Sequence, residues 1–464
     1  LTSVVENASS AAIAALVSKS ISRGWVRGIL AGMAVGIGLM EGFDIGAINS
    51  LYIGVFGLFA GMAGEKLSAR NFLKSALVVA VMAVFAGLTA AHTLSSLIGT
   101  QLNGSTEQEK MSKEERWWFV TQWSLPKKET LRILIPGIFG YRMDTEGTGI
   151  PYEKSYWGAV AQTPGFEDPG ENYHKGTARH SGSGEYAGIF VLLVAFLAIA
   201  QSLRKQNSPF TPNEKKMIWF WSAIALISLL FAFGRHAPFF QIIFALPLIS
   251  TIRNTLKHLN PFHVALLILF GYGLESMARR YFETAKNNLT TAFEKRWRLF
   301  SGAAFGFAVL SWMIYASSKK DLLNYLGKNF PTSIATQIAE FSIGEMGWFV
   351  LFLAASVALV WMILSGKFVG KLKLAGILMG ALIIADLSHA NVNWIVYQNY
   401  KIKYQTNPII DFLRHKPYEQ RVMGMLPMRV NDTLSSFQQF YFVEWLQHHF
   451  YFYNIQSLDV PQNP

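Results

Sequence analysis

Two carboxylates separated by two residues interrupt a long apolar part of the sequence. Glu41 and Asp44 stand in the segment Met40-Glu-Gly-Phe-Asp-Ile45, between two apolar stretches. Carboxylate oxygens suit Mg or Mn, so the pair could share a divalent ion, or one of them could act as a base on a bound hydroxyl. Acids close to membrane depth are usually functional, whereas Gly42 suits a plain solvated turn. We predict a catalytic or metal-binding role and keep the turn as the alternative.

Cationic side chains gather in a second segment, where Pro238 and Pro247 interrupt apolar sequence. Arginine presents a fork that fits paired phosphate oxygens, and lysine supplies a point charge, so these residue types favour a phosphate or diphosphate group. Plain contact with lipid headgroups is the alternative. The predicted phosphate-binding residues are Arg235, His236, Arg253 and Lys257.

The remaining chemistry-bearing residues give weaker signals. The chain has no cysteine, which excludes disulfides, thiolate metal sites and cysteine nucleophiles. Its ten histidines show no metal-ligand spacing. Asp386 and His389 could form a polar pair that faces a cavity, but an interfacial position explains them equally well. Gly-rich stretches such as Gly32–Gly38 lack the context of a phosphate loop and indicate close helix packing instead.

The composition identifies the elements that must position these residues. Of the 464 residues, 51% are hydrophobic and only 15% are charged, whereas a soluble domain has about 25% charged residues. The net charge of +12 does not indicate a nucleic-acid partner, because Lys and Arg stand beside apolar runs instead of forming one basic face. The sequence therefore predicts a polytopic membrane protein whose first partner is the lipid bilayer.

Nine stretches are long and apolar enough to cross a bilayer, which predicts an all-α transmembrane bundle of about nine helices. We divide the chain into residues 1–92 with three spans, 93–185 as an outer loop with interfacial helices, 186–390 with six spans, and 391–464 as the start of a C-terminal domain. Because the sequence starts without Met and stops without a closing element, we expect both ends to be incomplete. The predicted spans are Gly24–Met40, Ile45–Met62, Leu73–His92, Tyr186–Leu203, Met217–Phe233, Phe262–Met277, Leu299–Tyr315, Trp348–Leu364 and Leu374–Leu387.

The distribution of Lys and Arg predicts the orientation. Short loops on one side carry 19 of these residues and those on the other side carry 6. Because the basic side is usually cytoplasmic, the long loop and the C-terminal segment should lie outside. In that loop, Ser112-Lys-Glu-Glu115 has a capping-box pattern and precedes a Trp-rich segment, which predicts a helix lying in the membrane interface.

Several segments together resemble the bacterial YfhO-type membrane proteins, which look like members of the GT-C class of glycosyltransferases. The resemblance implies an inner-membrane helical bundle that transfers a sugar from a polyprenyl-phosphate carrier to an acceptor on the outer face. In that class a catalytic carboxylate usually lies in the first long outer loop, and here no such loop precedes Glu41. The segments that carry the resemblance are Leu134–Gly140, Tyr156–Gly158, Phe233–Pro238, Leu246-Pro247 with Arg253, and Asn407–Leu413 with Arg421-Val422.

The residues and the resemblance agree on one mechanism. Glu41 or Asp44 takes the proton of the acceptor, and the cations stabilise the phosphate leaving group in a single inverting displacement, with no cofactor beyond a possible divalent metal. Aromatic residues of the long loop would stack on sugar: Tyr152, Tyr156 and Trp157. Two other functions stay open, namely a non-catalytic subunit or scaffold of a membrane complex with protein partners, and a transporter.

Overall fold

The chain is represented by a computed structural model, which forms two compact units. The first unit comprises Leu1–Ser95 and Met111–Ile395, and the second comprises Ser96–Lys110 and Val396–Pro464. Within the described residues the fold is all-α and contains no β-strand. The structure describes residues 2–18, 20–63, 68–97, 112–141, 154–160, 185–245, 252–282 and 291–394, and parts of 400–456.

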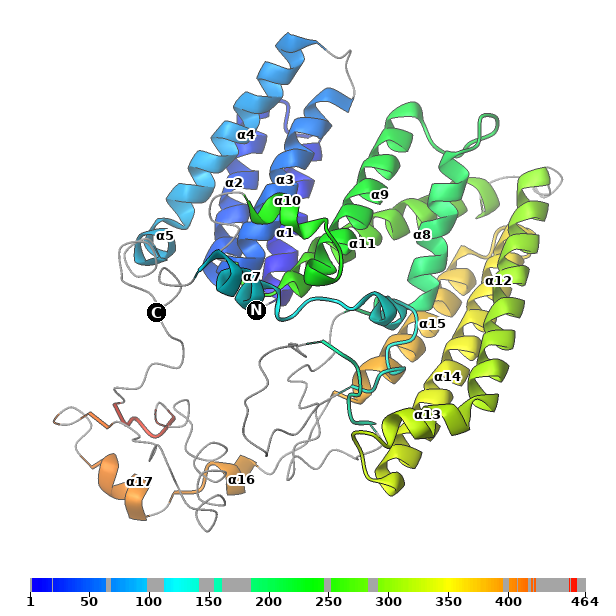
Figure 1. The fold of residues 1–464 in the computed structure, drawn as a ribbon. Coiled ribbons are helices and arrows are strands. Elements are labelled where there is room, and N and C mark those ends of the chain that lie inside the picture. The colour runs from blue at the N-terminus through cyan, green and yellow to red at the C-terminus, as the bar shows by residue number, and fades with distance from the viewer. Residues whose placement is uncertain are drawn as a thin grey trace. The chain divides into compact units, whose positions relative to one another are not determined.

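The first unit is built from long helices joined by short helical turns (Figure 1). Its α-helices are α1 (Thr2–Val17), α2 (Gly24–Glu41), α3 (Phe43–Ala63), α4 (Ala69–Thr89), α5 (Ala91–Leu97), α7 (Lys113–Thr121), α8 (Ile189–Ser202), α9 (Pro212–Ala232), α10 (Phe240–Phe244), α11 (Leu259–Met277), α12 (Ala292–Ser317), α13 (Lys319–Leu326), α14 (Thr332–Leu364) and α15 (Leu372–Val392). Its short turns are η2 (Lys127–Ile133), η4 (Gly234–His236), η6 (Thr255–His258) and η7 (Ala278–Phe282).

Seven helices in the described part are long and apolar enough to span a bilayer, compared with the nine predicted. The predicted first span forms α2, whose apolar character is reduced by Arg27 and five glycines. The predicted fourth span forms α8, which has only 14 residues and is shorter than a bilayer core requires. The seven spans are Phe43–Ala63, Ala69–Thr89, Pro212–Ala232, Thr255–Phe282, Ala292–Ser317, Thr332–Leu364 and Leu372–Val392. The chain therefore has the composition of an integral membrane protein.

Helices α1–α4 pack closely because small residues line their contacts. A Cβ on Gly32 would lie 2.4 Å from the carbonyl oxygen of Met82 in α4, and one on Gly36 would lie 2.5 Å from the Cβ of Thr89. Only glycine permits this approach of the two backbones. The prediction that the Gly32–Gly38 stretch serves helix packing is confirmed.

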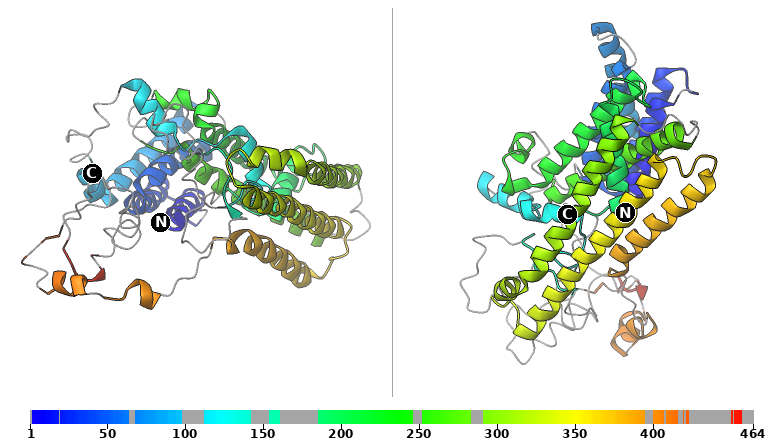
Figure 2. Two further views of the ribbon diagram at one scale, coloured as in Figure 1. Left: turned by 60° about the horizontal axis from the view of Figure 1, so that its bottom comes forward. Right: turned by 90° about the vertical axis from the view of Figure 1, so that its right-hand side faces the viewer.

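Helices α9 and α11 connect α1–α4 to the other long helices (Figure 1). Helix α11 packs on both α8 and α9, and α14 packs on α8, α12 and α15. Figure 2 shows α12, α14 and α15 side by side with similar tilt. Ion pairs connect the start of α12 to neighbouring elements. The Glu294 carboxylate lies 3.2 Å from Arg204, after α8, and 3.0 Å from Arg280 in η7.

The predicted interfacial helix forms as α7. Its capping box is present, since Ser112 Oγ accepts from the Glu115 amide and the Glu115 carboxylate accepts from the Ser112 amide. Helix α7 packs on the bundle through an apolar cluster, in which Val120 contacts residues of α3 and α10. We call this the α7 cluster, and its buried members are Ile48, Val120, Phe240, Phe244 and Ile252.

The described residues of the second unit contain two short helices, α16 (Tyr400–Lys403) and α17 (Pro408–Leu413). They have a small core of their own, and the Val422 amide donates to the Gln456 carbonyl at 2.8 Å. The buried core residues are Ile410, Phe450, Tyr453 and Ile455.

Candidate functional site

The predicted acids lie at the tight turn between α2 and α3. Helix α2 ends at Glu41, Gly42 follows as its C-cap, and α3 begins at Phe43. Asp44 therefore lies in the first turn of α3, where the positive end of the helix dipole favours a carboxylate. Its side chain accepts a hydrogen bond from Lys257 and forms an ion pair with it. Glu41 is exposed and forms no ion pair with another residue in the described part of the chain.

Lys257 belongs to a polar contact between α3 and the start of α11. The chain enters η6 through Asn254, whose φ of +79° is left-handed and whose amide donates to the Val120 carbonyl of α7 at 3.0 Å. This geometry places successive side chains of η6 and α11 against α3. Three pairs form the α3–α11 polar contact: Asp44 with Lys257, Tyr52 Oη with His258 Nδ1 at 3.4 Å, and Asn49 Nδ2 with Asn260 Oδ1 at 2.7 Å.

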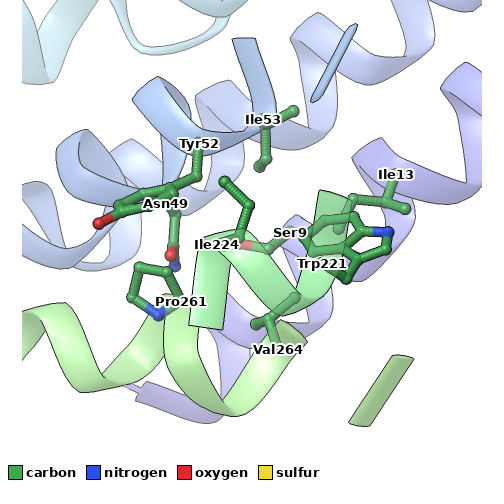
Figure 3. Close-up of a pocket in the computed structure, with 9 residues that line it drawn as sticks. All are labelled: Ser9, Ile13, Asn49, Tyr52, Ile53, Trp221, Ile224, Pro261 and Val264. Carbon is green, nitrogen blue, oxygen red and sulfur yellow. The ribbon is translucent and has the colours of Figure 1, made fainter. Parts of the chain in front are cut away.

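A small pocket lies beside this polar contact (Figure 3). Asn49 and Tyr52 of α3 line one part of it, and Trp221 of α9 and Val264 of α11 line another. Its volume of about 10 Å³ holds at most one water molecule. A substrate of the predicted size cannot enter there, so any ligand of Asp44 must approach from the surface at the α2–α3 turn.

Arg235 and His236 form the turn η4 that follows α9. The Arg235 amide donates to Ser124 Oγ at 3.1 Å, and its guanidinium lies over the Trp118 ring at 5.6 Å, within the range of a cation–π contact. Burial lowers the pKa of Arg235. Burial, together with the positive charges of Arg235 and Lys127, lowers the pKa of His236 below its usual 6.5. The histidine is therefore neutral over a wider pH range than a free one.

Arg253 approaches the same helix α7 from the segment before η6. Its guanidinium lies 5.5 Å from the centre of the Phe119 ring, and the side chain is exposed. Two neighbouring aromatic residues of α7 thus each lie beneath an arginine. The structure brings the four predicted phosphate-binding residues onto segments that contact α7 or α3.

The predicted aromatic residues lie elsewhere. Tyr156 is buried, and its hydroxyl donates to Glu129 Oε2 at 2.5 Å while it accepts from the Val160 amide at 3.0 Å. Trp157 packs on Phe139, with ring centres 4.7 Å apart. Tyr152 lies outside the described residues. Because Tyr156 is enclosed by protein, its ring is not available to stack on a sugar.

Tyr156 belongs to a buried charge network that the sequence does not reveal. Arg132 is 1% exposed and lies between two carboxylates, at 3.2 Å from Glu129 and 3.2 Å from Glu185. The Ala159 amide donates to the other oxygen of Glu129 at 2.6 Å. Burial and the charge of Glu129 raise the pKa of Tyr156. This network connects η2 with the segment around Tyr156 and with Glu185, which precedes α8. Its sequence signal is slight, since an acid and an arginine three residues apart are typical of any exposed helical turn.

A second missed acid is Glu345 in α14. It is buried, and Tyr141 Oη donates to it at 3.1 Å while His389 Nε2 lies 3.3 Å from its other oxygen. Asp386 and His389, one alternative for which was a polar pair, have different direct partners: Asp386 accepts from Tyr186 and from the Ile189 amide at the start of α8, whereas His389 contacts Glu345. The available signal for Glu345 was a charged residue immediately before a predicted span.

The predicted metal at Glu41 and Asp44 finds little support in this geometry. In the described ranges no three acidic or histidine side chains converge as metal ligands. The direct neighbour of Asp44 is an ammonium group, which repels a divalent cation. The residues present therefore do not fit a metal.

Comparison of the chain with known protein families, with characterised proteins and with solved structures finds no significant match.

Proposed function

We propose that this chain is a membrane glycosyltransferase that moves a sugar from a polyprenyl-phosphate carrier to an acceptor at the outer face. The observation that supports it most is the α7 cluster, which packs α3, α7, α10 and the segment before η6 against one another. These elements carry or adjoin Asp44 and the predicted phosphate-binding residues, whereas Glu41 lies at the end of α2, outside the cluster. Ile48 lies one turn after Asp44, Phe240 lies four residues after His236, and Ile252 precedes Arg253. This apolar contact supports a site in which Asp44 and the predicted phosphate-binding residues lie at one end of the bundle.

The chemistry needs a base and a stabilised leaving group. Asp44 takes the proton of an acceptor hydroxyl as its oxygen attacks the anomeric carbon of the sugar. The bond from that carbon to the phosphate oxygen breaks, and the polyprenyl phosphate leaves with the electron pair. Lys257, Arg235 and Arg253 supply the positive charge that stabilises this phosphate. The rings of Trp118 and Phe119 support this role, since they lie against the guanidinium groups of Arg235 and Arg253.

The orientation belongs to the same proposal. Asp44 at the start of α3, Arg235 in η4 after α9 and Lys257 in η6 before α11 lie at the chain ends of these helices opposite to the loops richest in Lys and Arg. By the positive-inside rule this end is extracytoplasmic, as a bacterial inner-membrane enzyme acting on a flipped lipid carrier requires.

Asp44 provides the sharpest test. Membranes containing the full chain would be incubated with radiolabelled polyprenyl-phosphate hexose, and transfer of label out of the lipid fraction measured. We expect Asp44→Asn to lower transfer by about 10²- to 10⁴-fold, the usual contribution of a positioned base. Asp321→Asn is the matched control, because Asp321 also lies in the first turn of a helix, α13, and is exposed. Wild-type rates in the Asp44 variant would refute the assignment.

A non-catalytic membrane subunit is the second candidate. Two observations favour it. Asp44 is already paired with Lys257, and the adjacent pocket of about 10 Å³ is too small for a substrate. This candidate predicts no transfer by the wild-type chain with any polyprenyl-phosphate hexose. It also predicts that a protein co-purifying with the chain is lost when the exposed face of α7 is changed, for example by Lys113→Glu.

A further inference from the structure

A pocket of about 320 Å³ lies between the first half of α14 and the last turn of α15. This volume is at the lower end of those that bind small molecules. None of its residues belongs to the site proposed above. Its polar and aromatic lining residues are Lys154, Phe341, Glu345, Trp348, His389 and Asn393.

Glu345 gives this pocket an acidic floor. Its side chain is only 4% exposed, and within the described ranges no Lys or Arg pairs with it. Tyr141 donates one neutral hydrogen bond, and His389 lies beside the other oxygen. A carboxylate accepts about four hydrogen bonds, so this one has acceptor capacity left. Ionisable groups inside spanning helices are costly and generally mark binding sites.

The backbone makes room for this carboxylate. A Cβ on Gly137 would lie 2.4 Å from Glu345 Oε2. Any other residue at position 137 would therefore displace the acid from its place. The glycine at position 137 thus leaves space for the carboxylate, which supports a functional role for this acid.

Aromatic rings accompany the acid. Trp348 and Phe341 line the pocket, and the Trp348 ring packs on His389 with centres 4.6 Å apart. Tyr141 packs edge-on against Phe341 at 6.0 Å. A buried carboxylate beside aromatic faces is the arrangement with which proteins bind ammonium groups.

Lys154 supplies the opposite charge to the same pocket. Its side chain is half-buried and forms no ion pair in the part of the chain that the structure describes. The pocket thus combines one acid and one primary amine, which complements a ligand carrying both an ammonium and an anionic group. A purely anionic headgroup would meet the buried charge of Glu345.

The surroundings of the pocket suit a lipid. Val392 lines the pocket and is 59% exposed, and Ile384 on the same helix α15 is 67% exposed. These apolar side chains provide a surface along which acyl chains can lie while the headgroup enters the pocket.

We propose that this pocket binds the zwitterionic headgroup of a phospholipid with a primary amine. The ammonium contacts Glu345, Trp348 and Phe341, and the phosphate contacts Lys154. Such a bound lipid would connect the first half of α14 to the last turn of α15. The proposal does not depend on glycosyl transfer.

Native mass spectrometry of the purified full chain tests it. The probes are phosphatidylethanolamine, phosphatidylcholine and phosphatidylglycerol with identical acyl chains. We expect the wild type to retain phosphatidylethanolamine at least about tenfold more strongly than phosphatidylglycerol. A tenfold ratio of dissociation constants requires only a modest difference in binding free energy. Phosphatidylcholine should bind less well than phosphatidylethanolamine, since its quaternary ammonium cannot donate a hydrogen bond to the carboxylate.

Glu345→Gln should abolish this preference, and Lys154→Gln should weaken retention of all three lipids. The matched control is Glu340→Gln, because Glu340 lies in the same helix but is exposed and pairs with Lys319 at 2.7 Å. If the Glu345 variant does not fold, Trp348→Leu tests the same pocket through a side chain that is 45% exposed. An unchanged preference in a folded Glu345 or Trp348 variant would overturn the proposal. Equal retention of the three lipids by the wild type, or displacement of the lipid by a soluble hexose, would overturn it too.

Discussion

Lys257 and Asp44 form an ion pair that connects the first turn of α3 to η6 across 213 positions of sequence. The two side chains are 21% and 42% exposed, so water screens their attraction. The pair therefore contributes little to folding. Under the proposed function, a ligand replaces either partner at small energetic cost because the pair is weak.

The first prediction concerns the strength of this pair. A double-mutant cycle with Asp44→Asn and Lys257→Met should give a coupling free energy of about 0.2–1 kcal/mol, as for other partly exposed pairs. The measurement is unfolding of the purified chain in mixed micelles. Lys319 and Glu340, which are 38% and 60% exposed, provide a comparison pair whose cycle should give a similar or smaller value. A coupling above about 3 kcal/mol would assign the pair to structure and remove the argument for a freely exchanging site.

Breaking the buried ion-pair network around Arg132 should cost much more stability than breaking the partly exposed pair of Asp44 and Lys257. Arg132→Met leaves Glu129 and Glu185 buried without a cation, and breaking such a network costs about 3–5 kcal/mol. The apparent melting temperature in detergent should fall strongly. Tyr156→Phe removes one hydrogen bond to Glu129 and should cost about 1–3 kcal/mol.

Lys128→Met is the control for Arg132→Met, because Lys128 lies in the same turn η2 and is exposed. It should leave the melting temperature nearly unchanged. If both variants lost the same stability, the effect would come from the helical turn and not from the paired charges.

The apolar pattern was sufficient to predict the membrane helices, because hydropathy is a property of each segment alone. It predicted bilayer spans at α2 and α8, which do not qualify as spans in the structure. The glycines of α2 reduce its apolar character, and contacts with neighbouring helices determine how short α8 is. Helix α8 begins at Ile189, where Asp386 of α15 accepts the amide of that residue. That contact connects segments 197 positions apart, and no local pattern encodes it.

In the candidate site, too, the sequence predicts residue types but not the tertiary contacts between them. Residue types alone singled out Asp44 and Lys257, but their pairing depends on how α11 packs against α3. Tyr156 was expected to face a ligand because aromatic residues in outer loops often do, and its burial follows from Glu129, whose charge needs a donor. Glu345 was missed because a charged residue just before an apolar run resembles an interfacial one, although α14 extends 13 residues further, to Thr332.

The packing of α2 on α4 gives a prediction about glycine. Gly32→Ala should destabilise the chain by about 1–3 kcal/mol, because the new methyl group would contact the Met82 carbonyl and force the helices apart. Gly54→Ala is the control, since nothing lies within 4 Å of a Cβ at that position. It should be neutral or slightly stabilising. Melting temperatures of the two variants in the same detergent decide the matter, and equal losses would contradict the close contact.

His236 should make stability depend on pH. Burial and the nearby Arg235 and Lys127 lower its pKa in the folded state, so the unfolded chain binds a proton more readily. The stability that this group contributes is complete above its ordinary pKa of 6.5 and is lost as the pH falls through that value toward the lowered one. His236→Gln should reduce the loss of melting temperature on acidification. His92→Gln, at an exposed histidine of α5, should not change it. Identical pH profiles of the wild type and the His236 variant would contradict the prediction.

The orientation can be tested directly because the chain has no cysteine of its own. Asn329, after α13, is exposed at the end predicted to be outside, and Gln206, between α8 and α9, is exposed at the basic end. We expect Asn329→Cys to react with a membrane-impermeant maleimide in intact cells. Gln206→Cys should react only after the membrane is opened, because 19 of the 25 Lys and Arg residues counted in the short loops lie on its side. The reverse labelling pattern would place Asp44 and Lys257 in the cytoplasm, where a lipid-linked sugar presented at the outer leaflet could not reach them.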